Sequence, residues 1–132
     1  MFNWNTDYKT VCCCMLSVIV FLLTGCGTGG VFDGSRVSNA SGFRMEYSIL
    51  NQEESADLNL MEGDCLKVSL SHKEGCVDVN VRLEGKEPIY QGNRQQNAHF
   101  SLEITETGNY HISVSGHKAK GNSTFTRIPG GQ

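Results

Sequence analysis

Apolar and polar residues alternate along most of the chain after residue 42, and this alternation is typical of half-buried β-strands. In the clearest case, Val77, Val79 and Val81 are separated by Asp78 and Asn80. The alternating segments are 43–49, 58–60, 66–70, 77–83, 100–104 and 110–114, with weaker ones around residues 89–90 and 125. Glycine-containing pairs between these segments, among them Glu74-Gly75, predict turns. No part of the body shows a helical stripe of apolar residues.

Each predicted strand has one apolar and one polar face, so two antiparallel sheets packed face to face would bury the apolar sides. The pattern therefore predicts an all-β fold. We expect an antiparallel β-sandwich of about 7–8 strands, arranged as a jelly roll or like an immunoglobulin domain.

The N-terminal part of the chain has a different pattern. Val11–Leu23 contains no charged residue and follows Lys9. The run is short for a membrane span, which needs about 20 apolar residues. It fits the hydrophobic region of a secretory signal, which has roughly 7–15 residues.

The residues at the end of this run, Leu23-Thr24-Gly25-Cys26, resemble the lipobox of bacterial lipoproteins. The resemblance implies that the Cys26 thiol receives a diacylglyceryl group and that the signal is cut between Gly25 and Cys26. The segment before the run departs from the pattern, because Lys9 is its only basic side chain and Asp7 offsets the charge. Two alternatives stay open, namely an uncut signal anchor and a core helix with a chance cysteine.

These features predict three parts: a lipoprotein signal peptide (1–25), the lipidated cysteine with a Gly/Ser-rich tether (26–42), and a β-sandwich domain (43–132). Two or more acyl chains hold a protein stably on a membrane. We therefore expect the protein to be lipid-anchored in the cell membrane and to face outside the cytoplasm.

Composition excludes several classes of protein. The formal net charge is −3 and 19% of the residues are charged, which gives no basic footprint for nucleic acid. Of the six cysteines, only Cys65 and Cys76 lie in the body, so no disulfide framework is predicted.

Two hairpins follow from pairing neighbouring strands. Joining 66–70 to 77–81 would place Cys65 and Cys76 about 20 Å apart, beyond the reach of a disulfide, and predicts two free thiols. Joining 100–104 to 110–114 would place Glu103 opposite His111 on the polar face.

Several side chains are candidates for chemistry. His99 and His111 fall on polar faces, whereas His72 and His117 fall in turn-like segments, and their spacing matches no metal motif. We interpret all four as exposed or satisfied, and we predict no metal and no cofactor. The turn-proximal acids are weak calcium candidates: Glu62, Asp64, Asp78 and Glu84. Tyr90 is expected to pack rather than to bind a glycan.

The order of apolar strands, with Gly108-Asn109-Tyr110-His111-Ile112 as its closest part, resembles bacterial prepeptidase C-terminal domains over roughly residues 55–127. Those domains are non-catalytic appendages of secreted proteins, and some bind calcium or polysaccharide. The resemblance implies a non-catalytic module here as well.

The sequence thus predicts a membrane-anchored lipoprotein with a non-enzymatic binding or accessory module, whose partner is an extracellular protein or glycan. The alternative is a secreted metal-dependent or hydrolytic enzyme with a site built from scattered His and Asp residues. A concave pocket with converging His and Asp side chains would favour the enzyme.

Overall fold

Seven antiparallel strands make up the part of the chain that the computed structural model describes, residues 30–130. Alternating burial along each strand shows why this sequence forms strands, because every second side chain enters the core. The fold is all-β, as the sequence predicts. The strands are β1 (Phe32–Asn39), β2 (Gly42–Leu50), β3 (Glu53–Leu60), β4 (Cys65–Leu83), β5 (Pro88–Gln95), β6 (Ala98–Glu103) and β7 (Gly108–Ile128).

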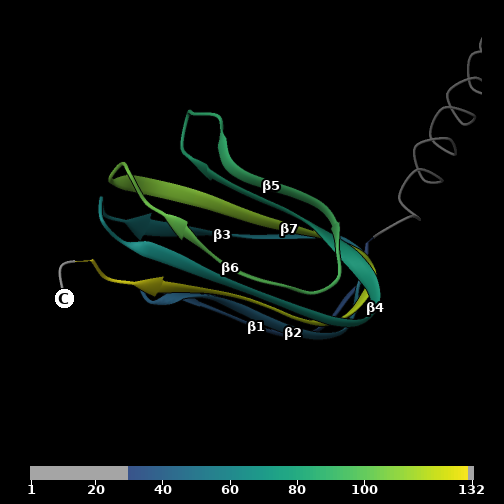
Figure 1. Ribbon diagram of the computed structural model, residues 1–132. Coiled ribbons are helices and arrows are strands. Elements are labelled where there is room, and N and C mark those ends of the chain that lie inside the picture. Colours follow the sequence, from purple (N-terminus) through teal and green to yellow (C-terminus); the bar gives the residue numbers. More distant parts are fainter. Residues whose placement is uncertain (1–29, 131–132) are drawn as a thin grey trace, which may run out of the picture.

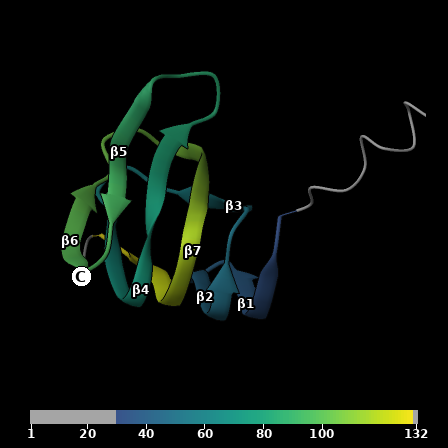
Figure 2. The same cartoon turned by 90° about the vertical axis from the view of Figure 1, so that its right-hand side faces the viewer.

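The two longest strands, β4 and β7, pass through both layers of the sandwich (Figure 1). They pair along their whole length, with Val68 opposite Phe125 in one layer and Val79 opposite Val114 in the other. One layer has the order β1-β2-β7-β4-β6 and the other has the order β3-β7-β4-β5. Figure 2 shows the curved β4 and β7 in the middle, with the other strands on either side. A single sheet is therefore folded over to form two layers.

The fold in the sheet occurs where the β4–β7 ladder is irregular. The register shifts on both sides of Glu74, and Gly75 adopts a φ of 68°, a left-handed conformation that favours glycine. The sequence predicts a turn at Glu74–Gly75, and this prediction is wrong. The two residues form a bulge inside one continuous strand, which bends the strand instead of reversing it.

The buried apolar side chains come from every strand except β1, β5 and β6 and fill the space between the layers. Phe43 and Phe125 stack with ring centroids 6.0 Å apart, and Tyr47 and Tyr110 are buried as their strand parity predicts. Fully burying a Phe, Leu, Ile, Val or Met side chain stabilises the folded state by about 1.5–3 kcal/mol relative to leaving it exposed.

The open side of the sandwich between β1 and β3 is spanned by Arg36. Its Nη1 lies 2.9 Å from Glu54 Oε2, and its guanidinium carbon lies 5.2 Å from the centroid of the Phe43 ring. An inward-pointing charge on an edge strand hinders pairing with another chain. Phe32–Asn39 falls in the segment predicted as a tether, so the ordered sandwich begins about ten residues earlier than residue 43.

Both predicted hairpins are wrong. β6 pairs with β4, so that Glu103 lies opposite Cys65, and β7 pairs with β3, so that His111 lies opposite Asp57. The predictions assumed that strands adjacent in sequence pair with each other. Here the chain crosses between the layers instead, at Gln96–Asn97 and after Glu103.

Cys65 and Cys76 lie on the same strand, β4, eleven positions apart. With a rise of about 3.3 Å per residue, that separation far exceeds the roughly 7 Å between Cα atoms that a disulfide spans. Both cysteines are free, but the reason is one continuous strand and not the predicted hairpin.

Candidate functional site

The outer face of the β3-β7-β4-β5 layer is covered by polar side chains in register, and we call it the polar face. Its central rows are Asp57–His111–Arg82 and Ser55–Ser113–Asn80. The row nearest the bend is Glu53–Ser115–Asp78. Strand alternation produces this face, because the residues between these positions point into the core.

One His–Asp hydrogen bond lies at the centre of the polar face. His111 Nδ1 donates to Asp57 Oδ1 over 2.8 Å, and Arg82 lies on the other side of His111 in the next strand. Together with Glu84 and Asn109 these side chains line a shallow hollow of about 420 Å³. The hollow offers both hydrogen-bond donors and acceptors to a ligand.

A second His–Asp pair lies on the same face, closer to the bend. His117 Nε2 donates to Asp78 Oδ2 over 2.8 Å, and the N–H of Arg94 donates to Asp78 Oδ1 over 2.8 Å. The hydrogen bond from His117 and then that from Arg94 hold the pKa of Asp78 below its ordinary value. The Asp78 carboxylate also satisfies the backbone of Arg94, which adopts a φ of 52°.

These pairs do not make a Ser–His–Asp set. The hydroxyl of Ser69 lies 3.0 Å from His99 Nδ1, but that contact is between β4 and β6 in the other layer. Within residues 30–130, no hydroxyl or thiol hydrogen-bonds to His111 or His117. The hollow on the polar face does bring a histidine and an aspartate together, His111 and Asp57, as the enzyme alternative requires. Its donors and acceptors can equally recognise a ligand through hydrogen bonds and charge.

The calcium candidates lie apart. Both carboxylate oxygens of Asp64 are already hydrogen-bonded, to the N–H groups of Met61 and Gly130 and to Arg127 Nε over 2.7 Å. Glu62 is exposed in the same turn, while Asp78 is at the bend. The part of the chain between residues 30 and 130 contains no cluster of three or more His, Cys, Asp or Glu residues that could hold a metal.

Tyr90 is partly buried and packs against Phe100, with ring centroids 4.6 Å apart. This contact agrees with the expected packing role. Because the Tyr90 ring packs against Phe100, it is not available on the polar face for stacking against a sugar.

The largest departure from the predicted sites is His72, which is 7% exposed and not in a turn. Its Nδ1–H donates to the Gln96 carbonyl over 2.6 Å, so its Nε2 accepts from the Tyr47 hydroxyl. Tyr47 in turn is 2.8 Å from Ser123 Oγ. Burial lowers the pKa of His72, with the Gln96 carbonyl acting in the opposite sense. The signal for this burial was present, because His72 continues the inward parity of Leu70.

A second hollow, the bend hollow, lies on the outer face of the β1-β2-β7-β4-β6 layer. It measures about 590 Å³ and is open to solvent. Lys73 and Lys120 are its two cationic side chains, and neither was singled out from the sequence. Its lining comprises Gly34, Ser35, Glu46, Tyr47, Ser48, Lys73, Lys120, Gly121 and Asn122.

Gly25 and Cys26, the predicted processing and lipidation residues, lie outside the described residues. Between residues 30 and 130 no helix is long and apolar enough to span a bilayer. Comparison with protein-family models and with curated proteins finds no match to this chain.

Proposed function

We propose that the protein is a small bacterial lipoprotein, anchored by a lipid on Cys26. It presents a non-catalytic β-sandwich that binds a protein or glycan outside the cytoplasmic membrane. The Leu23-Thr24-Gly25-Cys26 motif supports the anchor, and the laterally aligned polar face supports the binding role.

One structural observation carries the proposal. All buried apolar residues of the sandwich lie between Phe43 and Phe125, and the first strand begins at Phe32, six residues after Cys26. Cleavage between Gly25 and Cys26 therefore leaves the core of the sandwich complete.

The experiment for the anchor is expression of the full chain in a bacterium supplied with a labelled fatty acid. The wild type is expected to take up the label and to begin at Cys26, as measured by mass spectrometry of its N-terminus. Cys26→Ala is expected to lose both the label and the cleavage. Cys14→Ala is the matched control, since it removes a cysteine from the same region and leaves the motif intact. Label or cleavage in Cys26→Ala would overturn the proposal.

The experiment for the binding role uses a photo-crosslinking amino acid placed at single outward positions of the anchored protein. Ser113 lies at the centre of the polar face, and Thr124 lies on the same strand but on the outer face of the other layer. Crosslinks to a protein or glycan are expected from position 113 and not from 124. Equal crosslinking from both positions would remove the polar face from the proposal.

A further inference from the structure

The bend of β4 and β7 is at the same end of the sandwich as the start of the first strand (Figure 2). Phe32 lies opposite Leu50, and Leu50 lies opposite Ala119 in the bend of β7. The N–H of Asn51 donates to the Val31 carbonyl over 2.7 Å, which ties Val31 to the connection between β2 and β3. The chain therefore enters the fold at the bend.

Val31 lies only five positions after Cys26. A chain spans at most about 3.3–3.6 Å per residue, so Val31 lies within roughly 18 Å of the lipidated cysteine. A strand as long as β2, nine residues, extends about 30 Å. In the anchored form, the bend therefore stays within roughly 18 Å of the lipidated cysteine, whereas the opposite end can lie a strand length farther away.

The bend carries three of the five lysines between residues 30 and 130: Lys73, Lys118 and Lys120. All three are exposed, and none forms an ion pair with another residue of the described range. Lys73 and Lys120 line the bend hollow.

The acids at this end are partly engaged. Glu46 lies 3.9 Å from Arg44, the carboxylate of Asp33 accepts from Ser48, and Glu74 lies opposite Lys120 in register. Beside the bend, Asp78 accepts from His117, Glu54 pairs with Arg36, and Glu53 lies opposite Ser115.

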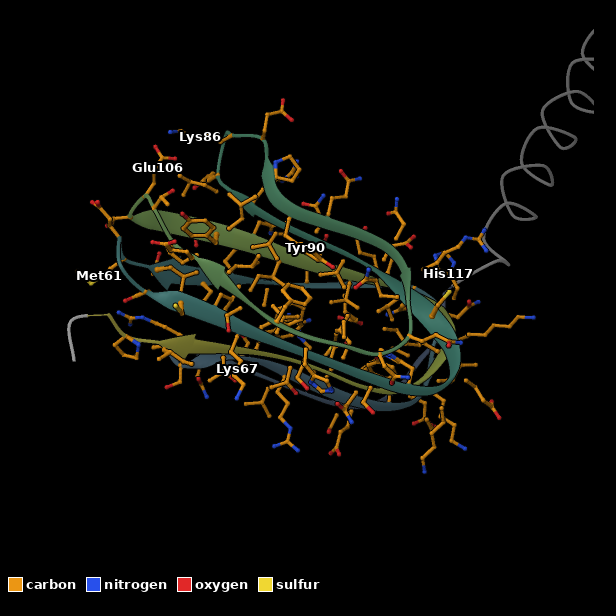
Figure 3. All side chains as sticks on the ribbon, in the orientation of Figure 1. Met61, Lys67, Lys86, Tyr90, Glu106 and His117 are labelled. Carbon is orange, nitrogen blue, oxygen red and sulfur yellow. The ribbon has the colours of Figure 1, made fainter. Side chains whose placement is uncertain are left out.

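The opposite end of the sandwich is acidic. Figure 3 shows Glu106 and Lys86 there, far from His117 at the bend, and these two side chains are ion-paired at 2.6 Å. The other acids at this end, apart from the buried Asp64, are Glu62, Glu84, Glu87 and Glu103. An anionic surface within a Debye length of about 8–10 Å attracts the three lysines of the bend and repels the carboxylates of the opposite end.

From this arrangement we propose that the bend end docks onto anionic phospholipid headgroups, with the bend hollow facing the bilayer. The ammonium groups of Lys73 and Lys120 and the hydroxyls of Ser35 and Ser48 supply donors to headgroup phosphates. Val31, which is 46% exposed, adds apolar surface at the same end. This inference rests on the proposed lipidation of Cys26.

The experiment uses the purified lipidated protein in vesicles of phosphatidylcholine alone or of phosphatidylcholine with phosphatidylglycerol. An amine-acetylating reagent labels exposed lysines, and mass spectrometry measures the labelling rate of each lysine. In anionic vesicles, Lys73, Lys118 and Lys120 are expected to react several-fold more slowly than in neutral vesicles. Lys67 and Lys86 lie away from the bend, so their rates are expected to stay unchanged. High salt is expected to abolish the protection.

Charge variants provide a second measurement. Replacing Lys73 and Lys120 with glutamine is expected to lower the ratio of docked to free domains by roughly fivefold per lysine, read from the labelling of Lys118. The matched control replaces Lys67 and Lys86 with glutamine, which makes the same change in net charge and is expected to preserve the protection of Lys118.

Three outcomes would overturn the docking proposal. Equal labelling of all lysines in both kinds of vesicle, on a protein whose Cys26 carries the lipid, rejects docking and leaves the proposed function standing. Absence of lipid on Cys26 rejects the proposed function and docking with it. Protection of Lys73 and Lys120 by inorganic phosphate without vesicles, and none by anionic vesicles, assigns the hollow to a free anion.

Discussion

The imidazole of His72 and the phenol of Tyr47 form a hydrogen bond that is closed to solvent, and their rings stack with centroids 5.6 Å apart. This contact connects β2 to β4 at the point where the sheet bends. A charged imidazole would have to lose its hydration there, which is why its pKa is lowered.

The first prediction concerns the pH dependence that His72 imposes. The pKa of His72 is below 6.5 in the folded protein and near 6.5 in the unfolded chain. At a pH between these two pKa values, the unfolded chain binds a proton at His72 and the folded protein does not. Stability is therefore expected to be complete above pH 6.5 and to fall as the pH drops below it. Urea unfolding between pH 5 and pH 8 measures this slope.

Two variants identify the source of the slope. His72→Gln is expected to flatten it and to cost about 1–3 kcal/mol at neutral pH, because the Tyr47 hydroxyl loses the imidazole nitrogen that accepts its hydrogen bond. His99→Gln replaces an exposed histidine and is expected to keep the slope. An unchanged slope in His72→Gln would show that another group is responsible.

The second prediction concerns Asp64. Hydrogen bonds from the N–H groups of Met61 and Gly130, and then from Arg127, lower the pKa of its carboxyl below 3.8. The resulting stabilisation is present above the unfolded pKa and is lost as the pH falls through the folded one. Asp64→Asn is expected to lower the thermal midpoint at neutral pH, with the deficit shrinking in acid.

Glu62→Gln, in the same turn, is the control for this measurement and is expected to leave the midpoint unchanged at both pH values. A deficit of Asp64→Asn that stayed constant from neutral pH to strong acid would contradict an ionised Asp64.

The third prediction concerns two ways in which replacing a glycine with alanine destabilises the fold, namely an unfavourable backbone conformation and a steric clash of the added β-carbon. Gly121 and Gly85 both have positive φ values, 151° and 77°. A β-carbon at Gly121 would lie 2.0 Å from the Ser71 carbonyl oxygen, whereas nothing lies within 4 Å at Gly85.

Gly85→Ala is therefore expected to cost about 1–2 kcal/mol from its backbone conformation alone. Gly121→Ala is expected to cost clearly more, because the bend must also shift. Chemical unfolding measures both, and equal costs would argue against the close contact at the bend.

The fourth prediction concerns the thiols. Because Cys65 and Cys76 are separated along one strand, the purified and denatured protein is expected to show two alkylatable thiols without reduction. The mass of each modified peptide gives the count. A monomer that lacks both thiols and weighs two units less would require a different path for β4.

Period-two alternation was sufficient to predict the all-β class and the burial of Tyr47 and Tyr110. It could not predict which strands pair. Alternation depends only on residues that are neighbours in the sequence, whereas the partner of a strand is set by segments far along the chain. Asp57 thus became the partner of His111 in place of Glu103. Likewise, Glu74–Gly75 has the composition of a turn, and only the pairing of β4 with β7 on both sides makes it a bulge.

The candidate site likewise includes some features that could be predicted from the sequence and others that depend on the fold. The two histidines assigned to polar faces from parity, His99 and His111, do lie there. The bend hollow was missed because Gly34 and Lys73 come together only through the folded sheet. Conversely, Asp64 is a residue type that often binds calcium, but its carboxylate oxygens already accept hydrogen bonds from Arg127 and Gly130, near the end of the chain.

The position of β1 has a mechanical consequence for an anchored protein. Among the strands of residues 30–130, β1 pairs with β2 alone, and its ladder runs from Phe32 at the bend to Asn39 at the far end. A tension applied through the lipid would pull along this strand, so the β1–β2 hydrogen bonds would carry the load together in shear. The Arg36–Glu54 contact would resist the same displacement. The edge strand would then be the first element of the fold to bear the load, and it would pass the force through β2 to β7 in the core.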